Sequence, residues 1–137
     1  MALAVRADGV HIGQSDMAYA DVIRIIPSSM LVGLSVENMQ QAMEAANLHV
    51  DYLGVSPVLA TSTKTNFQEK PWGLEGLQKL RSVTSNNLVA IGGINLSNVA
   101  DVIKAGADGI AVVSAICSAP DPKNAASELI KKVQQGK

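Results

Sequence analysis

The sequence predicts an α/β protein with a parallel β-sheet, because short apolar runs alternate with longer segments of helical periodicity. The runs are rich in Val, Ile and Leu without strict alternation, as in parallel strands buried on both faces. There are five of them: Gly9–Ile12, Met30–Ser35, Val50–Val55, Leu88–Ile94 and Gly109–Ile116. Strand–helix alternation at this spacing is typical of parallel βαβ units with outer helices.

Capping signals in the segments between the runs predict helices. Ser15 or Asp16 is expected to begin a helix through Ile26, Ser35 a second and Ser97 a further one. The side chains expected to face the sheet are Val36, Met39, Met43, Ala46, Leu74, Leu77, Leu80, Val83, Val99, Val102 and Ile103. Pro122 suits the first turn of a last helix, where a missing N–H costs nothing.

Two sheet arrangements fit this pattern equally well. One is an open, flavodoxin-like sheet of five strands; the other is part of a (β/α) barrel. The segments RADGVHIGQSD and AGADGIAVVSAI both run from Ala-Asp-Gly into an apolar strand, which suits a barrel built from similar units. A long loop, Pro57 to Trp72, follows the third run, and loops of this length are usually functional or disordered. No linker or charge block is present, so a single domain is expected.

The composition argues against several classes of protein. A net charge of −1 and 3% aromatic residues predict no nucleic-acid partner and no membrane surface. Cys117 is the single cysteine, so disulfides and cysteine metal clusters are excluded and a reducing cytoplasm is expected. We expect Cys117 to be a small buried apolar residue. The N-terminal stretch resembles neither a signal peptide nor a membrane span.

Ligands of parallel α/β proteins gather at the carboxyl ends of the strands, and the chain is unusual there. Gly92-Gly93 precedes a helix, and Ser114 ends the next strand. Glycine lets backbone N–H groups approach phosphate oxygens, and a helix N-terminus adds a favourable dipole. A plain tight turn is the alternative, but the pairing with Ser114 favours a phosphate site.

Other polar residues carry weaker signals. Asp16 offers a hard oxygen ligand for magnesium, although without a second acid nearby a helix cap explains it better. Lys64, among hydroxyl side chains, suits an anionic leaving group, although a solvated loop lysine is the commoner case. His11 and His49 are expected to be structural, without a Ser or Cys partner for nucleophilic catalysis. Taken alone, the residues predict a phosphate-binding α/β protein.

Seven stretches resemble thiamine phosphate synthase in order and spacing: ADGVHIGQSD, VGLSVEN, VDYLGVSPV, TSTKT, GLEGLQKL, VAIGGI and AGADGIAVVSAI. The resemblance covers almost the whole chain, and it implies a partial (β/α)8 TIM barrel with strands equivalent to the fourth to eighth. Residues 1–137 would then form a single, N-terminally incomplete barrel domain.

The resemblance implies a magnesium-dependent transferase of thiamine biosynthesis. The family joins hydroxymethylpyrimidine diphosphate to hydroxyethylthiazole phosphate, releasing pyrophosphate. Its mechanism is dissociative: pyrophosphate leaves first, and the thiazole nitrogen captures the pyrimidine-stabilised cation. By motif, Asp16 would bind Mg²⁺, Ser35 and Lys64 would contact the pyrimidine diphosphate and act in catalysis, and the thiazole phosphate would be bound by Thr61, Ser62, Thr63, Gly93, Val113 and Ser114.

The chain also departs from the family pattern. The family's Gln-x-Arg-x-Lys strand end and Asn-Asp pair would lie upstream of Met1, so we expect this chain alone to be inactive. One alternative is a non-catalytic fragment that binds thiazole phosphate or associates with itself or with a missing N-terminal part. A thiazole tautomerase-like protein is another, but that relative has a histidine where this chain has Val36.

Overall fold

The computed structural model describes residues 1–61 and 70–136. In this part of the chain, five strands form one parallel sheet in the order β1-β2-β3-β4-β5. The strands are β1 Gly9–Ile12, β2 Leu31–Val36, β3 Tyr52–Val55, β4 Asn87–Ile91 and β5 Gly109–Ala111. Each predicted apolar run overlaps one of them, which confirms the predicted parallel α/β fold.

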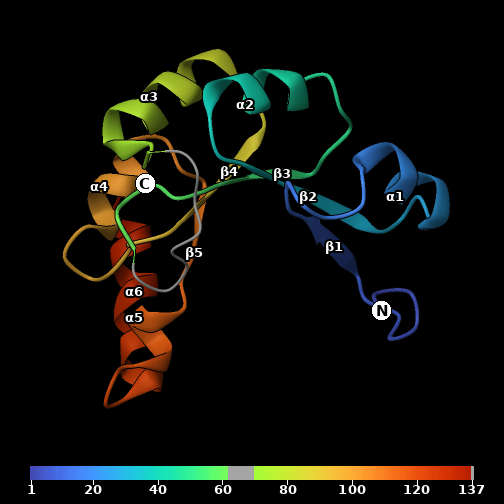
Figure 1. Ribbon diagram of the computed structural model, residues 1–137. Coiled ribbons are helices and arrows are strands. Elements are labelled where there is room, and N and C mark those ends of the chain that lie inside the picture. The colour runs from blue at the N-terminus through green and yellow to red at the C-terminus, as the bar shows by residue number, and fades with distance from the viewer. Residues whose placement is uncertain (62–69, 137) are drawn as a thin grey trace.

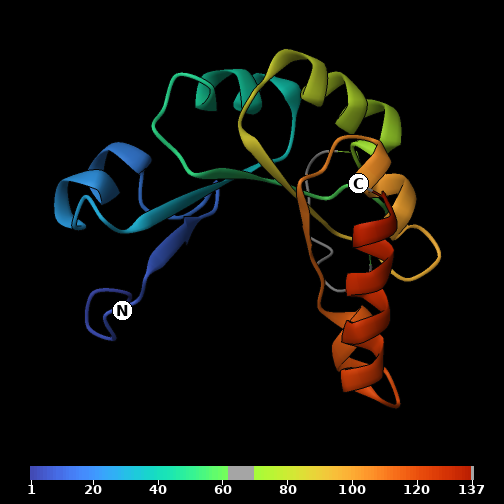
Figure 2. The same cartoon turned by 180° about the vertical axis from the view of Figure 1, so that it is seen from behind.

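The helices follow the sheet in an arc along one side (Figures 1 and 2). They are α1 Tyr19–Ile25, α2 Met39–Ala45, α3 Gly73–Val83, α4 Val99–Lys104, α5 Ser114–Cys117 and α6 Pro122–Gly136. Because each strand lies beside its predecessor in chain order, every right-handed crossover moves the same way and places its helix on the same face. A flavodoxin-like sheet reverses direction once, so that alternative is wrong.

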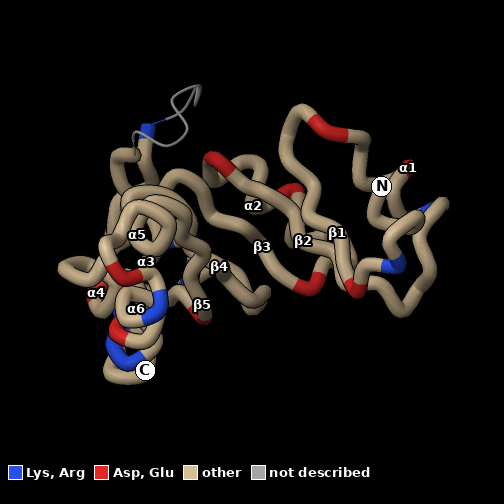
Figure 3. The backbone as a smooth tube through the Cα atoms, turned by 90° about the horizontal axis from the view of Figure 1, so that it is seen from below, with Lys and Arg blue, Asp and Glu red and all other residues tan. Residues whose placement is uncertain are grey.

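The two faces of the sheet differ in chemistry. The helix-covered face packs fully buried aliphatic side chains from strands and helices: Val36, Leu53, Val55, Leu77, Leu80, Leu88, Val99 and Val102. Since neighbouring residues of a strand point to opposite faces, the other face receives His11, Ser35, Tyr52 and several glycines. The five strands contain no Asp, Glu, Lys or Arg, as the uncoloured tube over most of their length shows (Figure 3).

Two predicted helix starts are wrong. Helix α1 begins at Tyr19 after Ala18, and neither Ser15 nor Asp16 caps it. Helix α4 follows Asn98, because Ser97 donates its hydroxyl to Asn95 Oδ1 instead. In both places the polar side chain bonds to its own turn, which competes with capping of the next helix.

Helix α2 also starts later than predicted, because Ser35 lies inside β2. Asn38 caps the helix by accepting the Gln41 N–H at 2.9 Å. Ala42 and Ala45 are buried, whereas Met43 is 49% exposed and Ala46 is exposed. Of the predicted inward stripe, Val36 and Met39 do contact the core, whereas Met43 and Ala46 were predicted wrongly, since Ala42 and Ala45 face the sheet in their place.

At two further positions, burial was predicted wrongly. Val83 in the last turn of α3 is 49% exposed, because the helix ends there and extends past the sheet. Cys117 is exposed and free in the short helix α5. The run Gly109–Ile116 splits into strand β5 and the start of α5, which an apolar run alone does not reveal.

Two aspartates form hydrogen bonds between neighbouring strands at the amino end of the sheet. Asp51, just before β3, accepts the Val32 N–H of β2 at 2.6 Å. Asp108, just before β5, accepts the Leu88 N–H at the start of β4 at 2.8 Å and pairs with Arg81 at 3.1 Å. These contacts stabilise the register and lie at the edge opposite the carboxyl ends of the strands. Within the described residues, no helix is long and apolar enough to cross a membrane.

Candidate phosphate pocket and inner-face polar cluster

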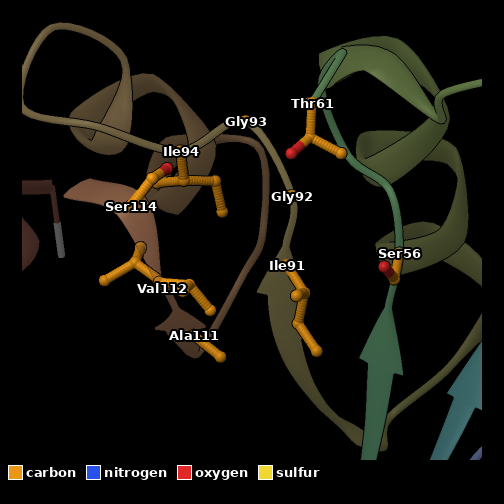
Figure 4. A pocket seen from close by; sticks show the side chains of 10 residues that line it. Ser56, Thr61, Ile91, Gly92, Gly93, Ile94, Ala111, Val112 and Ser114 are labelled. Atoms are coloured by element: carbon orange, nitrogen blue, oxygen red, sulfur yellow. The ribbon is translucent and has the colours of Figure 1, made fainter. Parts of the chain in front are cut away.

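A pocket of about 210 Å³ lies at the carboxyl ends of β4 and β5. It is lined by Ser56, Thr61, Ile91, Gly92, Gly93, Ile94, Ala111, Val112, Val113 and Ser114 (Figure 4). Thr61 and Ser114 lie on opposite sides of the Gly92–Gly93 turn, and the Thr61 side chain points toward it (Figure 4). We call this set of residues the phosphate pocket.

The glycine turn has a backbone that other residues adopt poorly. Gly92 and Gly93 have φ angles of 97° and 68°, in the left-handed region. A Cβ atom on Gly93 would lie 2.5 Å from the Ala60 carbonyl oxygen. The loop after β3 packs so closely because Val58 N–H donates to the Ile91 carbonyl at 2.8 Å, and Leu59 N–H donates to the Gly92 carbonyl at 3.1 Å. The turn is thus held rigidly from one side.

Ser114 contributes from the opposite side of the pocket, as the first residue of α5. The N–H groups of Ile116 and Cys117 donate to the Val113 carbonyl at 3.1 and 2.8 Å. The first N–H groups of any helix lack an acceptor within it, so those of Ser114 and Ala115 are available to a ligand. The described lining residues carry no charge, so they would bind an anion through neutral N–H and hydroxyl donors.

A second group of polar side chains lies on the inner face of β1, β2 and β3, and we call it the inner-face cluster: His11, Ser35 and Tyr52. His11 Nε2 lies 2.7 Å from Ser35 Oγ, and His11 Nδ1 lies 2.9 Å from the Tyr52 hydroxyl. The two rings are stacked with centroids 5.5 Å apart. Gln14 Nε2 donates to the Ser35 carbonyl, which anchors the end of β2.

Glycines make room for these contacts across the sheet. Gly33 of β2 is the register partner of both His11 on β1 and Tyr52 on β3. A Cβ on Gly33 would lie 2.1 Å from Tyr52 Cζ, and one on Gly54 would lie 2.8 Å from His11 Cε1. Without these two glycines the rings could not meet over β2.

Partial burial shifts the pKa of both side chains. Although His11 is an exposed residue, its imidazole is covered by Tyr52 and Gly54, and this desolvation lowers its pKa below 6.5 against the opposing charge of Asp16. Desolvation likewise raises the pKa of the Tyr52 hydroxyl. Both groups are therefore neutral near pH 7.

Asp16 lies in the turn after β1, exposed to solvent. Its Oδ2 accepts the Gly13 N–H at 2.7 Å, and its own N–H donates to the Gly13 carbonyl at 3.2 Å. Among residues 1–61 and 70–136, no three His, Cys, Asp or Glu side chains converge as a metal site. Asp16 therefore offers a single carboxylate.

The structure thus brings four predicted site residues together in the phosphate pocket, namely Thr61, Gly93, Val113 and Ser114. Ser35 instead lies in the inner-face cluster. Ser62, Thr63 and Lys64 lie outside the described residues.

His11 does have a serine neighbour that the sequence did not indicate, since its Nε2 lies 2.7 Å from Ser35 Oγ. Sequence reasoning missed His11, Tyr52 and Gln14 as potential site residues. The two-residue period of β1 and β2 was the available signal, because it places His11 and Ser35 on one face.

The sequential order of strands, the single layer of helices and the pocket at the carboxyl edge define an α/β protein of the barrel type. Within that class the chain belongs to the thiamine monophosphate synthase family, whose model matches residues 1–116.

Relatives and solved structures agree with this assignment. The chain is 53% identical over 129 residues to thiamine-phosphate synthase of Albidiferax ferrireducens, covering 94% of this chain and 58% of that protein. It is 49% identical over 130 residues to thiamine-phosphate synthase of Vibrio campbellii, covering 95% and 63%. Thiamine phosphate pyrophosphorylase from Pyrococcus furiosus matches with a TM-score of 0.86 at 41% identity, covering 98% of this chain and 63% of that one. The chain thus spans about three fifths of the length of these relatives.

Proposed function

We propose that the chain provides the thiazole-phosphate side of a thiamine phosphate synthase, a transferase of thiamine biosynthesis. The reaction would join hydroxymethylpyrimidine diphosphate to hydroxyethylthiazole phosphate and release pyrophosphate. The observation that carries the proposal is the pocket that unites Gly93 with Ser114, in a chain 53% identical to a thiamine-phosphate synthase.

In this proposal the phosphate pocket binds the phosphate of the thiazole. Backbone N–H groups at the glycine turn and at the start of α5 would donate to its oxygens, together with the Ser114 hydroxyl. Thr61 lines the same pocket and would contact the thiazole, with Ser62 and Thr63 beside it in sequence. Val113 is 57% exposed, so its backbone rather than its side chain would make the contact.

The pyrimidine diphosphate would lie over the inner-face cluster. Ser35 would donate to or accept from the pyrimidine, and Lys64 would pair with the diphosphate as a compact positive charge. The bond from the pyrimidine methylene carbon to the diphosphate oxygen breaks, and a bond from that carbon to the thiazole nitrogen forms. No proton transfer is needed, so the chain's task is to align two substrates and stabilise the leaving anion.

Magnesium fits this chain as a partner of the substrate. Mg²⁺ usually takes one or two carboxylates together with substrate phosphates and water, rather than a full protein cage. Asp16, with its exposed carboxylate, would be that ligand. When bound, the ion would neutralise charge on the diphosphate. Asp16 also accepts the Gly13 N–H through one carboxylate oxygen, and this hydrogen bond would hold the carboxylate in place.

A binding experiment tests the phosphate pocket. We expect thiazole phosphate, titrated into the ¹⁵N-labelled chain, to shift the amide signals of Gly93 and Ser114. The unphosphorylated thiazole alcohol should bind about 10- to 100-fold more weakly, since hydrogen bonds to a charged group are lost. Ser114→Ala should weaken binding of the phosphate about tenfold, and Ser118→Ala, one helical turn further on, should not. Equal affinity for the phosphate and the alcohol would contradict the proposal.

Turnover by this chain alone is expected to be negligible. Among the described residues we assign a single carboxylate, Asp16, to the diphosphate, and loss of one electrostatic partner commonly costs on the order of 100-fold or more. Thiamine phosphate formed from both substrates is the measurement. A non-catalytic thiazole-phosphate-binding role is the second candidate, favoured by the phosphate pocket, whose described lining offers uncharged hydrogen-bond donors and no charged group. A tautomerase role is not favoured, because Val36 is fully buried in the core.

We also propose self-association and a cytoplasmic location. Strands β1 and β5 each pair with one neighbour within the described sheet, so each has an edge with unpaired backbone groups. Light scattering across a dilution series should show a mass that rises with concentration, and a constant monomer mass would contradict it. The free, exposed Cys117 suits a reducing compartment.

A further inference from the structure

His11 stands between two hydroxyl groups, on Tyr52 at Nδ1 and on Ser35 at Nε2. The proposed function assigns no role to either His11 or Tyr52. We propose that Tyr52, acting through His11, fixes the Ser35 hydroxyl as a hydrogen-bond donor toward the ligand. This inference rests on the proposed contact between Ser35 and the pyrimidine. As a donor, Ser35 would select an acceptor atom of the ligand, such as an unprotonated ring nitrogen.

The neutral His11 imidazole can satisfy its two hydroxyl contacts in a limited number of ways. Such a ring carries one N–H donor and one acceptor nitrogen, so only two arrangements satisfy both contacts. In the first, Tyr52 donates to Nδ1, and Nε2–H donates to Ser35 Oγ. In the second, Ser35 donates to Nε2, and Nδ1–H donates to the Tyr52 oxygen. The Ser35 proton is free for a ligand only in the first.

Acidity favours the first arrangement. A phenol, with a pKa near 10, is a much stronger donor than an aliphatic hydroxyl, so Tyr52 donates and Ser35 accepts. Desolvation raises the Tyr52 pKa, which keeps this proton on the phenol. The lowered pKa of His11 keeps the imidazole neutral, as the arrangement requires. Asp16, the charged group that acts on the ring, opposes this by favouring the imidazolium.

Surrounding contacts restrict the Ser35 hydroxyl further. The Ser35 carbonyl already accepts from Gln14 Nε2, and the side chain lies beside Gly54, which has no Cβ to cover it. In the first arrangement the hydroxyl proton is therefore free to point toward the inner face. There it would orient a flat ring laid against His11 and Tyr52.

The same arrangement separates this cluster from a serine hydrolase. In such enzymes the histidine accepts the serine proton, and a carboxylate stabilises the imidazolium. Here Nε2 already carries the proton, and a neutral phenol stands in place of the carboxylate. Tyr52 and His11 are thus positioning residues, and Ser35 does not become a nucleophile.

Imidazole nitrogen NMR of the ¹⁵N-labelled 137-residue chain, without ligand, tests the inference. At neutral pH we expect His11 Nε2 to resonate as a protonated nitrogen and Nδ1 as an unprotonated, hydrogen-bonded one. Exposed His49 supplies the reference signal within the same spectrum. A protonated Nδ1 in the wild-type chain would overturn the inference.

Two phenylalanine variants form a matched pair, because each removes one tyrosine hydroxyl and keeps the ring. Tyr52→Phe should move the Nδ1 signal toward that of a free nitrogen and raise the population of the Nδ1–H form. Tyr19→Phe, whose hydroxyl donates to the His49 carbonyl at 2.9 Å, should leave the His11 signals unchanged. Unchanged His11 signals in Tyr52→Phe would overturn the inference, as would labelling of wild-type Ser35 by a fluorophosphonate. Since no ligand is involved, these outcomes are independent of whether the chain binds pyrimidine diphosphate.

Discussion

The phosphate pocket and the inner-face cluster lie at the same sheet but are built from different parts of the chain. In the pocket the donors are mostly backbone groups. Gly92 and Gly93 adopt positive φ angles there, which lets their turn pack against the loop after β3. In the cluster the contacts are hydrogen bonds between side chains, and Gly33 of β2 leaves the space in which they form. A backbone site is rigid and tolerates few substitutions at its turn. A side-chain cluster can rearrange when one member changes.

Replacing a glycine in each region should show this difference, with the largest effect in the pocket. In Gly93→Ala the new methyl group meets backbone at 2.5 Å, and the φ of 68° is strained for alanine. We expect a loss of roughly 2 kcal/mol or more in the free energy of unfolding, measured by urea denaturation. Gly109→Ala is the control, because no atom lies within 4 Å of its Cβ. Equal stability of the two variants would show that the turn is not rigid.

The second glycine variant, Gly33→Ala, should cost less. Its methyl group meets the far end of the Tyr52 ring at 2.1 Å, and that ring can swing away. We expect a loss of about 1 kcal/mol, mainly from the broken hydrogen bond to His11. The His11 imidazole signals should change while the Gly93 amide does not. A loss as large as that of Gly93→Ala would mean that the cluster is as rigid as the pocket.

Aspartates at the amino edge provide a comparison in stability alone. Asp51→Ala and Asp108→Ala each leave a strand N–H without its carboxylate acceptor, at β2 and β4. We expect each to lower the free energy of unfolding by about 1 kcal/mol, since both carboxylates are partly exposed. Asp108→Ala should cost slightly more, because its ion pair with Arg81 is also lost. Neither variant should alter the affinity for thiazole phosphate. A changed affinity would show that the amino and carboxyl edges of the sheet are coupled.

The smallest expected effect is a dependence of stability on pH through His11. Because the folded-state pKa of His11 lies below its unfolded value of 6.5, the unfolded chain binds the proton more readily. The contribution of the neutral ring is complete above pH 6.5 and is lost as the pH falls from there through the folded pKa. His11→Gln should flatten this part of the pH profile of urea midpoints. A steeper profile in His11→Gln would reverse the assigned direction.

Some of this molecule follows from sequence alone. The apolar runs specify the parallel strands, and the runs at Gly9–Ile12 and Gly109–Ile116 begin where the edge strands begin. Gly93 and Ser114 could be paired in advance, because parallel strands bring their carboxyl ends to one edge. Chain order and residue chemistry suffice for such inferences.

Other features depend on which strands are neighbours, which only the tertiary structure decided. The barrel-type winding required the order β1-β2-β3-β4-β5, since pattern alone allowed an open sheet with a reversal equally well. The contact of His11 with Ser35 and Tyr52 spans 24 and 41 residues of sequence. It arises because Gly33 on β2 leaves space for two rings on the strands that flank it, β1 and β3. Such space between side chains is a property of packing that no single segment encodes.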